Sequence, residues 1–219
     1  MNPNSEETEK LNKIHNFMCG ILDSDQSGHD SSHIDRVIGL TKKILKKEPT
    51  ANQFIVLASA TLHDTYDDKL FVDQGEAKKK VIDFLNAIDV DPKPIIYIID
   101  NMSWSAETFG QAKKLDINGQ IVQDADRLEA IGAIAIIRAF KYAFKHQQID
   151  YDPKIKARVL KNKTDYRNGK QTTINHFYEK LFKIKDSLNT ETAKQIAKRR
   201  DEFMHEFVKE YISEYNLDA

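Results

Sequence analysis

The stretch "FIVLASATLHDTYDDKL", which runs from Phe54 to Leu70, joins an apolar helix to a cluster of charges. Its first eight residues are apolar or small at almost every position, which is typical of a helix buried on all sides. The last nine contain three aspartates, one histidine and one lysine. Because buried charges cost several kcal/mol unless something pairs with them, this stretch predicts a solvated helix end, an ion-pair network or a metal site.

The rest of the chain predicts an all-α protein. Apolar residues recur every three or four positions, whereas strand-like alternation lasts only a few residues. The run "PIIYIID", residues 94–100, fits either a strand or a short buried helix. The prolines fall between the periodic segments, where helices are expected to break. Helices are expected at roughly 5–22, 31–47, 51–63, 75–89, 93–102, 119–126, 128–147, 172–186 and 190–216.

Composition limits the possible partners. The 219 residues carry 33 basic and 34 acidic side chains, so the chain has no general attraction for nucleic acid or an anionic membrane. The single cysteine, Cys19, excludes an intrachain disulfide and fits a reducing compartment. The polar start "MNPNSEETEK" is unlike a secretory signal, and the longest apolar run, residues 128–140, is too short to span a bilayer. We therefore expect a cytoplasmic protein without nucleic-acid or membrane partners.

Four residues stand beside apolar helices and could converge on one ion: His33, His63, Asp64 and Asp126. Three of them also have a simpler explanation. His33 could be a satisfied core histidine, Asp64 a carboxylate at a helix end, and Asp126 the N-cap of a helix that begins near Leu128. Together, two imidazoles and two carboxylates suit a hard or borderline divalent ion.

Longer phrases around these residues carry a resemblance to a known family. The order H…HD…D resembles the HD-domain metal-dependent phosphohydrolases, and more narrowly a bacterial subgroup of stand-alone HD proteins. The resemblance covers nearly the whole chain and departs from the family's phrases at Ser31 and Ala135. Its phrases are "GHDSSHIDRV" at 28–37, "LHDTYDDK" at 62–69, "VQDADRLEAIGAIAIIRAF" at 122–140 and "HFYEKL" at 176–181.

The resemblance implies an all-α HD domain that spans 1–219. Its metal-binding core would occupy about 28–140, with C-terminal helices at about 172–216 packed on it. One divalent ion is expected, with Mn²⁺ preferred and Fe²⁺, Zn²⁺, Mg²⁺, Ni²⁺ or Co²⁺ as alternatives. The chain would act as a monomer or a homodimer. The implied ligands are His33, His63, Asp64 and Asp126.

The ion would lower the pKa of bound water and polarise a phosphoryl oxygen, while Asp64 orients the water. The general acid is expected to be Asp67 in preference to Asp68, which would then contact the substrate. Alternatively, both aspartates hold Lys69 and its loop in place. Lys69 is a candidate catalytic cation. The other candidates for binding the substrate are His29, Arg36, Arg127, Arg138, His176 and Lys180.

Three of these assignments have alternatives. Arg138 interrupts an apolar helix and needs an anion, which could be the substrate or a buried Asp67 or Asp68. Arg36 could be a surface residue. His29 could orient a ligand imidazole rather than touch the substrate.

The segment 154–170 carries seven cations against the single acid Asp165. It is either a solvated loop or a mobile basic flap over an anionic ligand.

The expected activity is hydrolysis of a nucleotide, preferably a nucleoside triphosphate cut to monophosphate and pyrophosphate. A nucleoside monophosphatase and an alarmone hydrolase are the alternatives within this class. The non-enzymatic alternative is a sensor that binds nucleotide or metal without catalysis.

Overall fold

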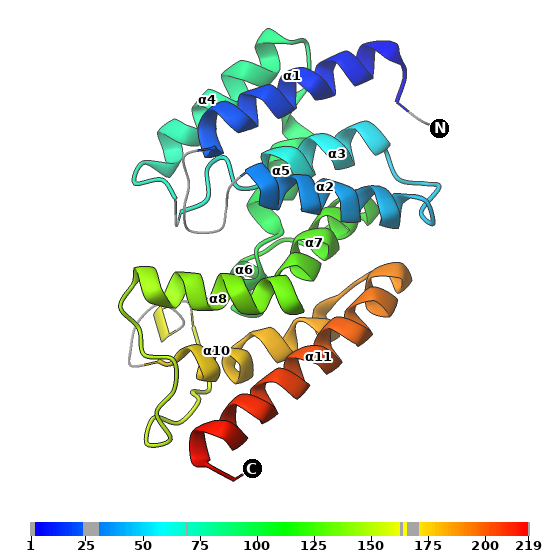
Figure 1. Ribbon diagram of the computed structural model, residues 1–219. Coiled ribbons are helices and arrows are strands. Elements are labelled where there is room, and N and C mark those ends of the chain that lie inside the picture. Colours follow the sequence, from blue (N-terminus) through cyan, green and yellow to red (C-terminus); the bar gives the residue numbers. More distant parts are fainter. Residues whose placement is uncertain (1–2, 24–30, 69, 163, 166–170, 219) are drawn as a thin grey trace. The chain divides into compact units, whose positions relative to one another are not determined.

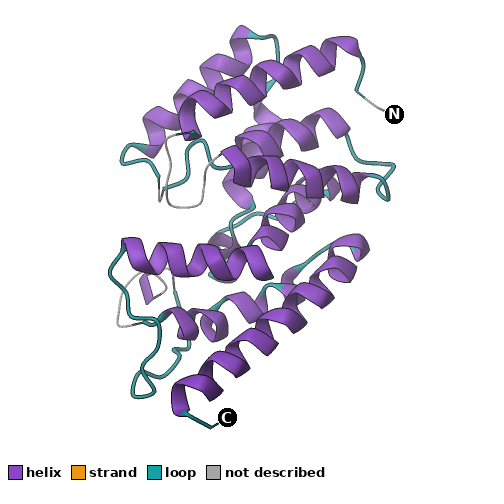
Figure 2. Ribbon diagram, in the orientation of Figure 1, coloured by secondary structure: helices purple, strands orange, loops and turns teal. Residues whose placement is uncertain are grey.

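The computed structural model describes residues 3–23, 31–68, 70–162, 164–165 and 171–218. Within these ranges the chain forms helices and no strand, so the predicted all-α fold is confirmed (Figure 2). The ambiguous run at 94–100 lies in a helix. Contacts divide the chain into two compact units, Met1–Asp126 and Arg127–Ala219. That these units act as a single domain stays a prediction.

The first unit is built around a central buried helix, α3, whose residues Val56–Leu62 are all buried. It packs against α1, α2 and α5 (Figure 1). The charge-rich turn that follows α3, residues 63–66, therefore begins in the middle of this unit. The helices are α1 (Ser5–Leu22), α2 (Ser31–Leu45), α3 (Gln53–Leu62), α4 (Gln74–Ala87), α5 (Pro92–Asn101), α6 (Trp104–Thr108) and α7 (Ile117–Glu129).

Short polar residues set the starts of these helices. Asn52 accepts a hydrogen bond from the Ile55 amide at 3.0 Å and so caps α3. Asp91 caps α5, and Pro92 occupies its first turn, where the missing amide proton costs nothing. The main core of the unit then forms from α1, α3, α4 and α5, with fully buried residues such as Leu62 and Leu85. Burial of each such side chain stabilises the fold by about 1.5–3 kcal/mol.

The second unit contains α8 (Ala133–Lys145), α10 (Thr173–Glu179) and the long α11 (Glu191–Asn216). Both α10 and α11 pack on α8. Aromatic rings join these helices: the ring centroid of Phe207 in α11 lies 6.1 Å from those of the half-buried Phe140 and the fully buried Phe177. Two short 3₁₀ turns, η1 (Leu181–Lys183) and η2 (Lys185–Ser187), lead from α10 toward α11.

The break between α7 and α8 differs from the expected one. A break near residue 127 was expected, but α7 continues to Glu129 and α8 begins at Ala133. Gly132 supplies the break with a φ of 93°, and a Cβ there would lie 3.0 Å from the Arg200 side chain. The idea that Asp126 caps a helix is therefore wrong, because Asp126 lies in the last turn of α7.

Two other boundaries were also missed. The helix expected at 172–186 ends at Glu179, because Lys180 adopts a φ of −137° that the α-helix does not permit. The short helix α6 was not expected at all; Ser103 caps it through the amide of Ala106.

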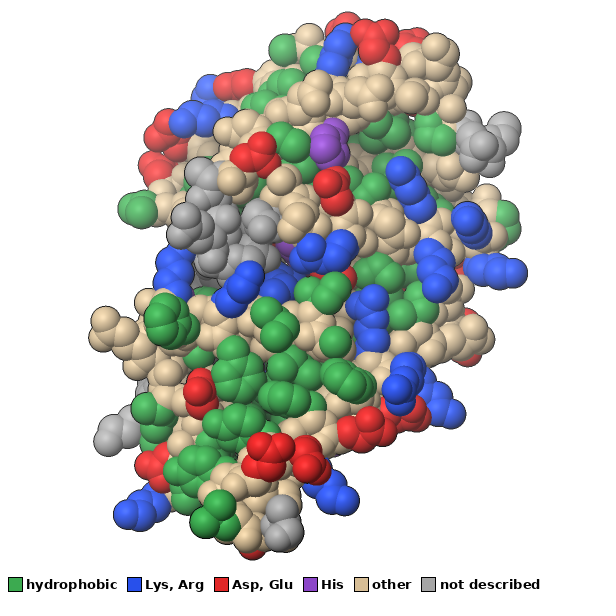
Figure 3. Space-filling view, viewed as in Figure 1, with side chains coloured by type: hydrophobic (Ala, Val, Ile, Leu, Met, Phe, Trp, Pro, Cys, Tyr) green, Lys and Arg blue, Asp and Glu red, His purple; other side chains and the backbone are tan. Residues whose placement is uncertain are grey.

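Hydrophobic side chains gather on one face of the second unit, over α8 and α11 (Figure 3). Ile137 and Phe144 of α8 are 58% and 88% exposed. Exposed apolar faces of this kind are typical of surfaces that contact another molecule. Whether the chain acts as a monomer or as a homodimer stays a prediction. Within the described ranges, the structure contains no helix with the length and apolar character needed to cross a membrane.

Candidate metal centre

Three elements of the first unit deliver the four predicted ligands to one place. His33 lies in the first turn of α2, and Asp126 lies in the last turn of α7. His63 and Asp64 form the turn directly after α3. Neighbouring residues inside a helix point about 100° apart. The two side chains nevertheless face the same point, although His63, the C-cap of α3, keeps helical angles with φ −59° and ψ −32°.

The distances fit a shared ion. Asp126 Oδ1 lies 3.6 Å from the Nε2 atoms of both His33 and His63. The Asp64 carboxylate lies 3.4 Å from His63 Nε2 and 3.6 Å from His33 Nε2. Two donors that each lie about 2.1 Å from an ion are separated by roughly 3–3.5 Å. The observed spacings are slightly longer than direct hydrogen bonds and close to this value.

The tautomer of His63 leaves its ligating atom free. Its Nδ1 lies 2.9 Å from the carbonyl oxygen of Ala60 and must donate to it, because a carbonyl only accepts. In the neutral imidazole the lone pair then resides on Nε2, which is buried and for which the described residues provide no hydrogen-bond partner. A backbone carbonyl on the far nitrogen is the usual support for a histidine that binds a metal.

Electrostatics in the cluster favour a cation. Burial lowers the pKa of His63, but the Asp64 and Asp126 carboxylates outweigh it and raise the pKa to about 9. Burial alone would raise the pKa of the Asp126 carboxyl. The imidazoles of His33 and His63 have a larger, opposite effect and hold that pKa well below its usual value. The buried Asp64 and the partly exposed Asp126 thus favour positive charge, which a proton supplies on His63 and a divalent ion would supply better.

The donor set therefore fits a divalent ion on spacing, tautomer and charge. His33, His63 and Asp64 are all buried, and their donor atoms lie within 4.8 Å of one another. Asp126 joins them through Oδ1. Binding of an ion by these four residues stays a prediction.

The loop beyond Asp64 holds the predicted acids. Asp67 donates its backbone amide to the Asp64 carbonyl at 3.2 Å, and its own carbonyl accepts from Leu70 and Phe71. Asp67 and Asp68 are both half-buried. His29 and Lys69 lie outside the described residues.

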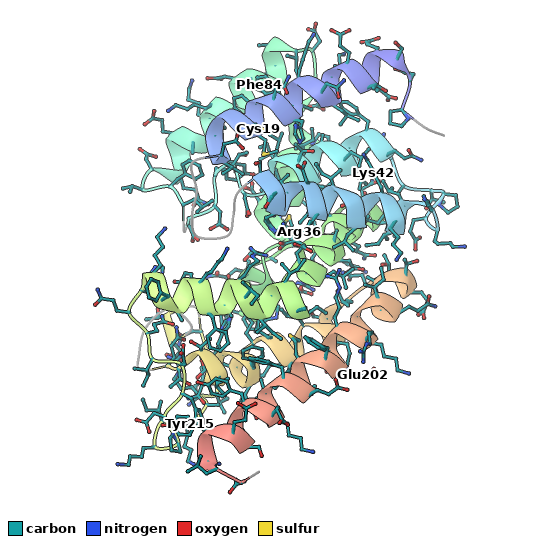
Figure 4. The ribbon with its side chains drawn as sticks, viewed as in Figure 1. Cys19, Arg36, Lys42, Phe84, Glu202 and Tyr215 are labelled. Carbon is teal, nitrogen blue, oxygen red and sulfur yellow. The ribbon has the colours of Figure 1, made fainter. Side chains whose placement is uncertain are left out.

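Arg36 extends from α2 (Figure 4) and donates to the Ser32 hydroxyl at 3.1 Å, one turn earlier. It is half-buried, so it is not a fully exposed surface residue. Its contact with substrate stays a prediction.

The remaining predicted residues belong to the second unit. Arg127 is 2% exposed and donates from Nη1 to the Ser187 carbonyl. Arg138 donates from Nη1 to the Glu129 carbonyl at 3.3 Å. His176 lies within α10 and Lys180 directly follows that helix. Substrate binding by these four residues stays a prediction.

One ion pair was missed in the sequence. Arg158 was counted among cations that an outside ligand would neutralise, but the carboxylate of Glu179, which is 1% exposed, already holds it. Nε and Nη2 of Arg158 donate to this carboxylate at 2.9 and 2.8 Å, and the Arg158 amide adds a third bond at 2.9 Å. The signal was available: Glu179 stands between aromatic and apolar residues in "HFYEKL". Lys163 and residues 166–170 of this basic segment lie outside the described residues.

Comparison with known proteins places these features in context. No family model matches the chain. The uncharacterized protein YpgQ of Bacillus subtilis is 34% identical over 202 residues, which cover 91% of this chain and 90% of YpgQ. A crystal structure of YpgQ in complex with ADP has a TM-score of 0.73 and 30% identity, and the match covers 95% of this chain and 96% of that one.

Two further crystal structures are similar over almost the whole length. A protein from Lactobacillus plantarum has a TM-score of 0.87 and 40% identity, and the match covers 99% of this chain and 100% of that one. An HD-superfamily hydrolase from Bacillus thuringiensis has a TM-score of 0.71 and 35% identity, with 96% and 98% of the two chains covered.

Proposed function

Because the chain belongs to the HD superfamily of hydrolases, we propose that it is a metal-dependent phosphohydrolase acting on a nucleotide. The observation that carries the proposal is the convergence of two imidazoles and two carboxylates in the first unit, three of these side chains being buried. The residues that would hold the ion are His33, His63, Asp64 and Asp126.

A bound divalent ion lowers the pKa of water and polarises a phosphoryl oxygen. Around it, the side chains of the protein divide the remaining work. Asp64 accepts a hydrogen bond from the attacking water and so orients it. Asp67, on the same loop, donates a proton to the leaving group, and Lys69 neutralises charge on the phosphates. The roles of Asp67 and Lys69 are proposed from their places in the sequence, directly after the ligand pair His63–Asp64.

The substrate class rests on two supports. YpgQ was crystallised with ADP, which supports a nucleotide. The cations of segment 154–170 support a polyphosphate, although Arg158 is already neutralised within the protein. The preferred reaction is therefore cleavage of a nucleoside triphosphate to a monophosphate and pyrophosphate. Hydrolysis of a nucleoside monophosphate or an alarmone, and non-catalytic nucleotide sensing, are the competing functions.

The proposal extends to the setting in which the enzyme works. Mn²⁺ is the preferred ion, because a mixed set of imidazole and carboxylate ligands suits it. The single cysteine supports the reducing cytoplasm as its location. The near-neutral charge supports a small-molecule substrate rather than a nucleic acid.

The function is tested with purified protein, Mn²⁺ and a panel of nucleoside mono-, di- and triphosphates and alarmones. Inorganic phosphate and pyrophosphate are measured separately. We expect pyrophosphate from the triphosphates, and we expect Asp64→Ala to abolish its release. Asp83→Asn is the matched control, because Asp83 is an exposed aspartate of the same unit whose partner is Lys79.

Each competing function predicts a different result. Release of phosphate from monophosphates alone would replace the preferred reaction by a nucleotidase. Release of neither product by a metal-loaded protein that still binds nucleotide would make it a sensor.

A further inference from the structure

A polar network stands behind the turn that carries His63 and Asp64. Tyr66 ends this turn, and its ring lies in the main core of the first unit, 3% exposed. Its hydroxyl donates to Asp100 Oδ1 of α5 at 3.2 Å. The other oxygen of Asp100 accepts from Lys78 Nζ of α4 at 2.6 Å. The same ammonium group lies 5.8 Å from the centroid of the Tyr66 ring, so the three side chains form a closed set.

We propose that Tyr66 and Asp100 are positioning residues of the metal centre. They would hold the turn after α3 so that the Asp64 carboxylate stays directed at the imidazoles of the two histidine ligands. The inference rests on the proposed function, since it concerns the ion that these ligands would bind.

The turn is fixed at its two ends by different means. His63 at its start donates from Nδ1 to the Ala60 carbonyl, and the Thr65 hydroxyl further along donates to the Leu62 carbonyl at 2.6 Å. Both bonds join the turn only to the end of its own helix. At its other end, Tyr66 joins it to α5 through Asp100. Asp64 lies between these two anchors, so its carboxylate depends on both.

The chemistry of the network favours a firm anchor. The Tyr66 hydroxyl is the donor of this bond, because the Asp100 carboxylate can only accept. The negative charge of the acceptor strengthens this bond, although its length of 3.2 Å lies above the roughly 2.5–3.0 Å usual between two oxygens. Lys78 balances the charge of Asp100, whose side chain is only 38% exposed. The anchor therefore leaves no uncompensated charge at the edge of the core.

Loss of the Tyr66–Asp100 hydrogen bond is expected to weaken the affinity of the site for its metal ion. Substitution of residues that orient metal ligands typically costs about 10- to 100-fold in metal affinity. Because Tyr66 and Asp100 do not touch the substrate in this scheme, excess metal should restore turnover.

The test uses Tyr66→Phe, which keeps the buried ring and removes only the hydroxyl, together with Asp100→Asn. The dissociation constant for Mn²⁺ is measured by titration of free Mn²⁺ with electron paramagnetic resonance. We expect this constant to rise about 10-fold or more in both variants. At saturating Mn²⁺, kcat should return to within about twofold of wild type, and KM should not change.

Tyr97→Phe is the control for a lost tyrosine hydrogen bond. Tyr97 also belongs to α5, but its hydroxyl donates to the Lys114 carbonyl, away from the turn. Lys78→Met and Lys79→Met form a second pair on α4, because Lys79 pairs with the exposed Asp83. We expect a weaker Mn²⁺ affinity for Lys78→Met alone, which also serves if Asp100→Asn does not fold.

The possible failures are distinguishable. If wild type binds Mn²⁺ and hydrolyses nucleotides, but Tyr66→Phe and Lys78→Met bind Mn²⁺ within twofold of wild type, this inference is overturned and the proposed function stands. A lower melting temperature with unchanged Mn²⁺ affinity would likewise reduce the network to a structural role. If wild type itself binds no Mn²⁺, the proposed function and this inference fail together.

Discussion

His63 Nε2 lies 3.4 Å from Asp64 Oδ1, although the two residues are sequence neighbours and both are almost fully buried. Neighbouring side chains in a regular helix point about 100° apart. This pair nevertheless converges directly after α3, where His63 is the C-cap with φ −59° and ψ −32°. The apolar helix α3 is thus followed by charged residues because His63 and Asp64, directly after it, contribute to a buried site that fits a divalent ion.

The first prediction concerns metal content. His63→Ala and Asp64→Ala each remove a buried donor, so we expect wild type to carry about one transition metal per chain and both variants to lose it. Elemental analysis after gel filtration measures this. His146→Ala, an exposed histidine at the end of α8, is the control. Equal occupancy in wild type and both ligand variants would remove the assignment.

The second prediction concerns the protonation of His63 and its effect on the stability of the metal-free protein. The pKa of His63, about 9 without metal, lies above its ordinary value of 6.5. Its protonation therefore stabilises the metal-free fold fully below about pH 6.5, and this contribution is lost as the pH rises through 9. The metal-free protein should lose stability between pH 7 and pH 9.5 in denaturant titrations.

At pH 7, binding of Mn²⁺ must also displace the proton of His63. Calorimetry in buffers of different ionisation enthalpy should report release of about one proton. Binding without proton release would show that His63 Nε2 is not a ligand.

The third prediction concerns phosphate binding. If Lys69 and Arg127 contact phosphates in the transition state, Lys69→Met and Arg127→Met should each lower kcat/KM roughly 10- to 1000-fold. Metal content should not change. Because Arg127 also donates to Ser187, the melting temperature of each variant is measured alongside. Activity within twofold of wild type would assign both cations to structural roles.

The fourth prediction concerns the buried pair Arg158–Glu179. Glu179→Gln leaves the Arg158 guanidinium without its counter-charge, so the free energy of unfolding should fall by roughly 2–4 kcal/mol. Residues 154–165 should also become more sensitive to protease, because Arg158 joins this segment to α10. Glu202→Gln, at an exposed position of α11 (Figure 4), should have neither effect. Unchanged protease sensitivity would mean that other contacts hold the segment.

Much of the fold followed from the sequence, because local signals agree with it. The pattern of α3 is apolar at every turn, and α1 and α11 begin after capping residues Asn4 and Thr190. The break between α7 and α8 was predicted at the wrong residue, and its cause is not only local. The break at Gly132 reflects a positive φ and contact with Arg200, more than sixty residues away.

The candidate site shows the same division. The four predicted ligands were named from the apolar helices beside them and from a family resemblance, and the structure brings them together. The Tyr66–Asp100 bond and the Arg158–Glu179 pair were not predicted. Both join residues more than twenty positions apart on different elements, so even where the sequence marks one partner, as it does for Glu179, it does not identify the other.

Anomalous diffraction at the manganese edge tests the central claim most directly. A crystal of the wild-type protein grown with Mn²⁺ should show one strong peak, bonded to the Nε2 atoms of His33 and His63 and to the carboxylates of the two aspartates. Absence of a peak at this position, or a peak bonded to other residues, would contradict the account.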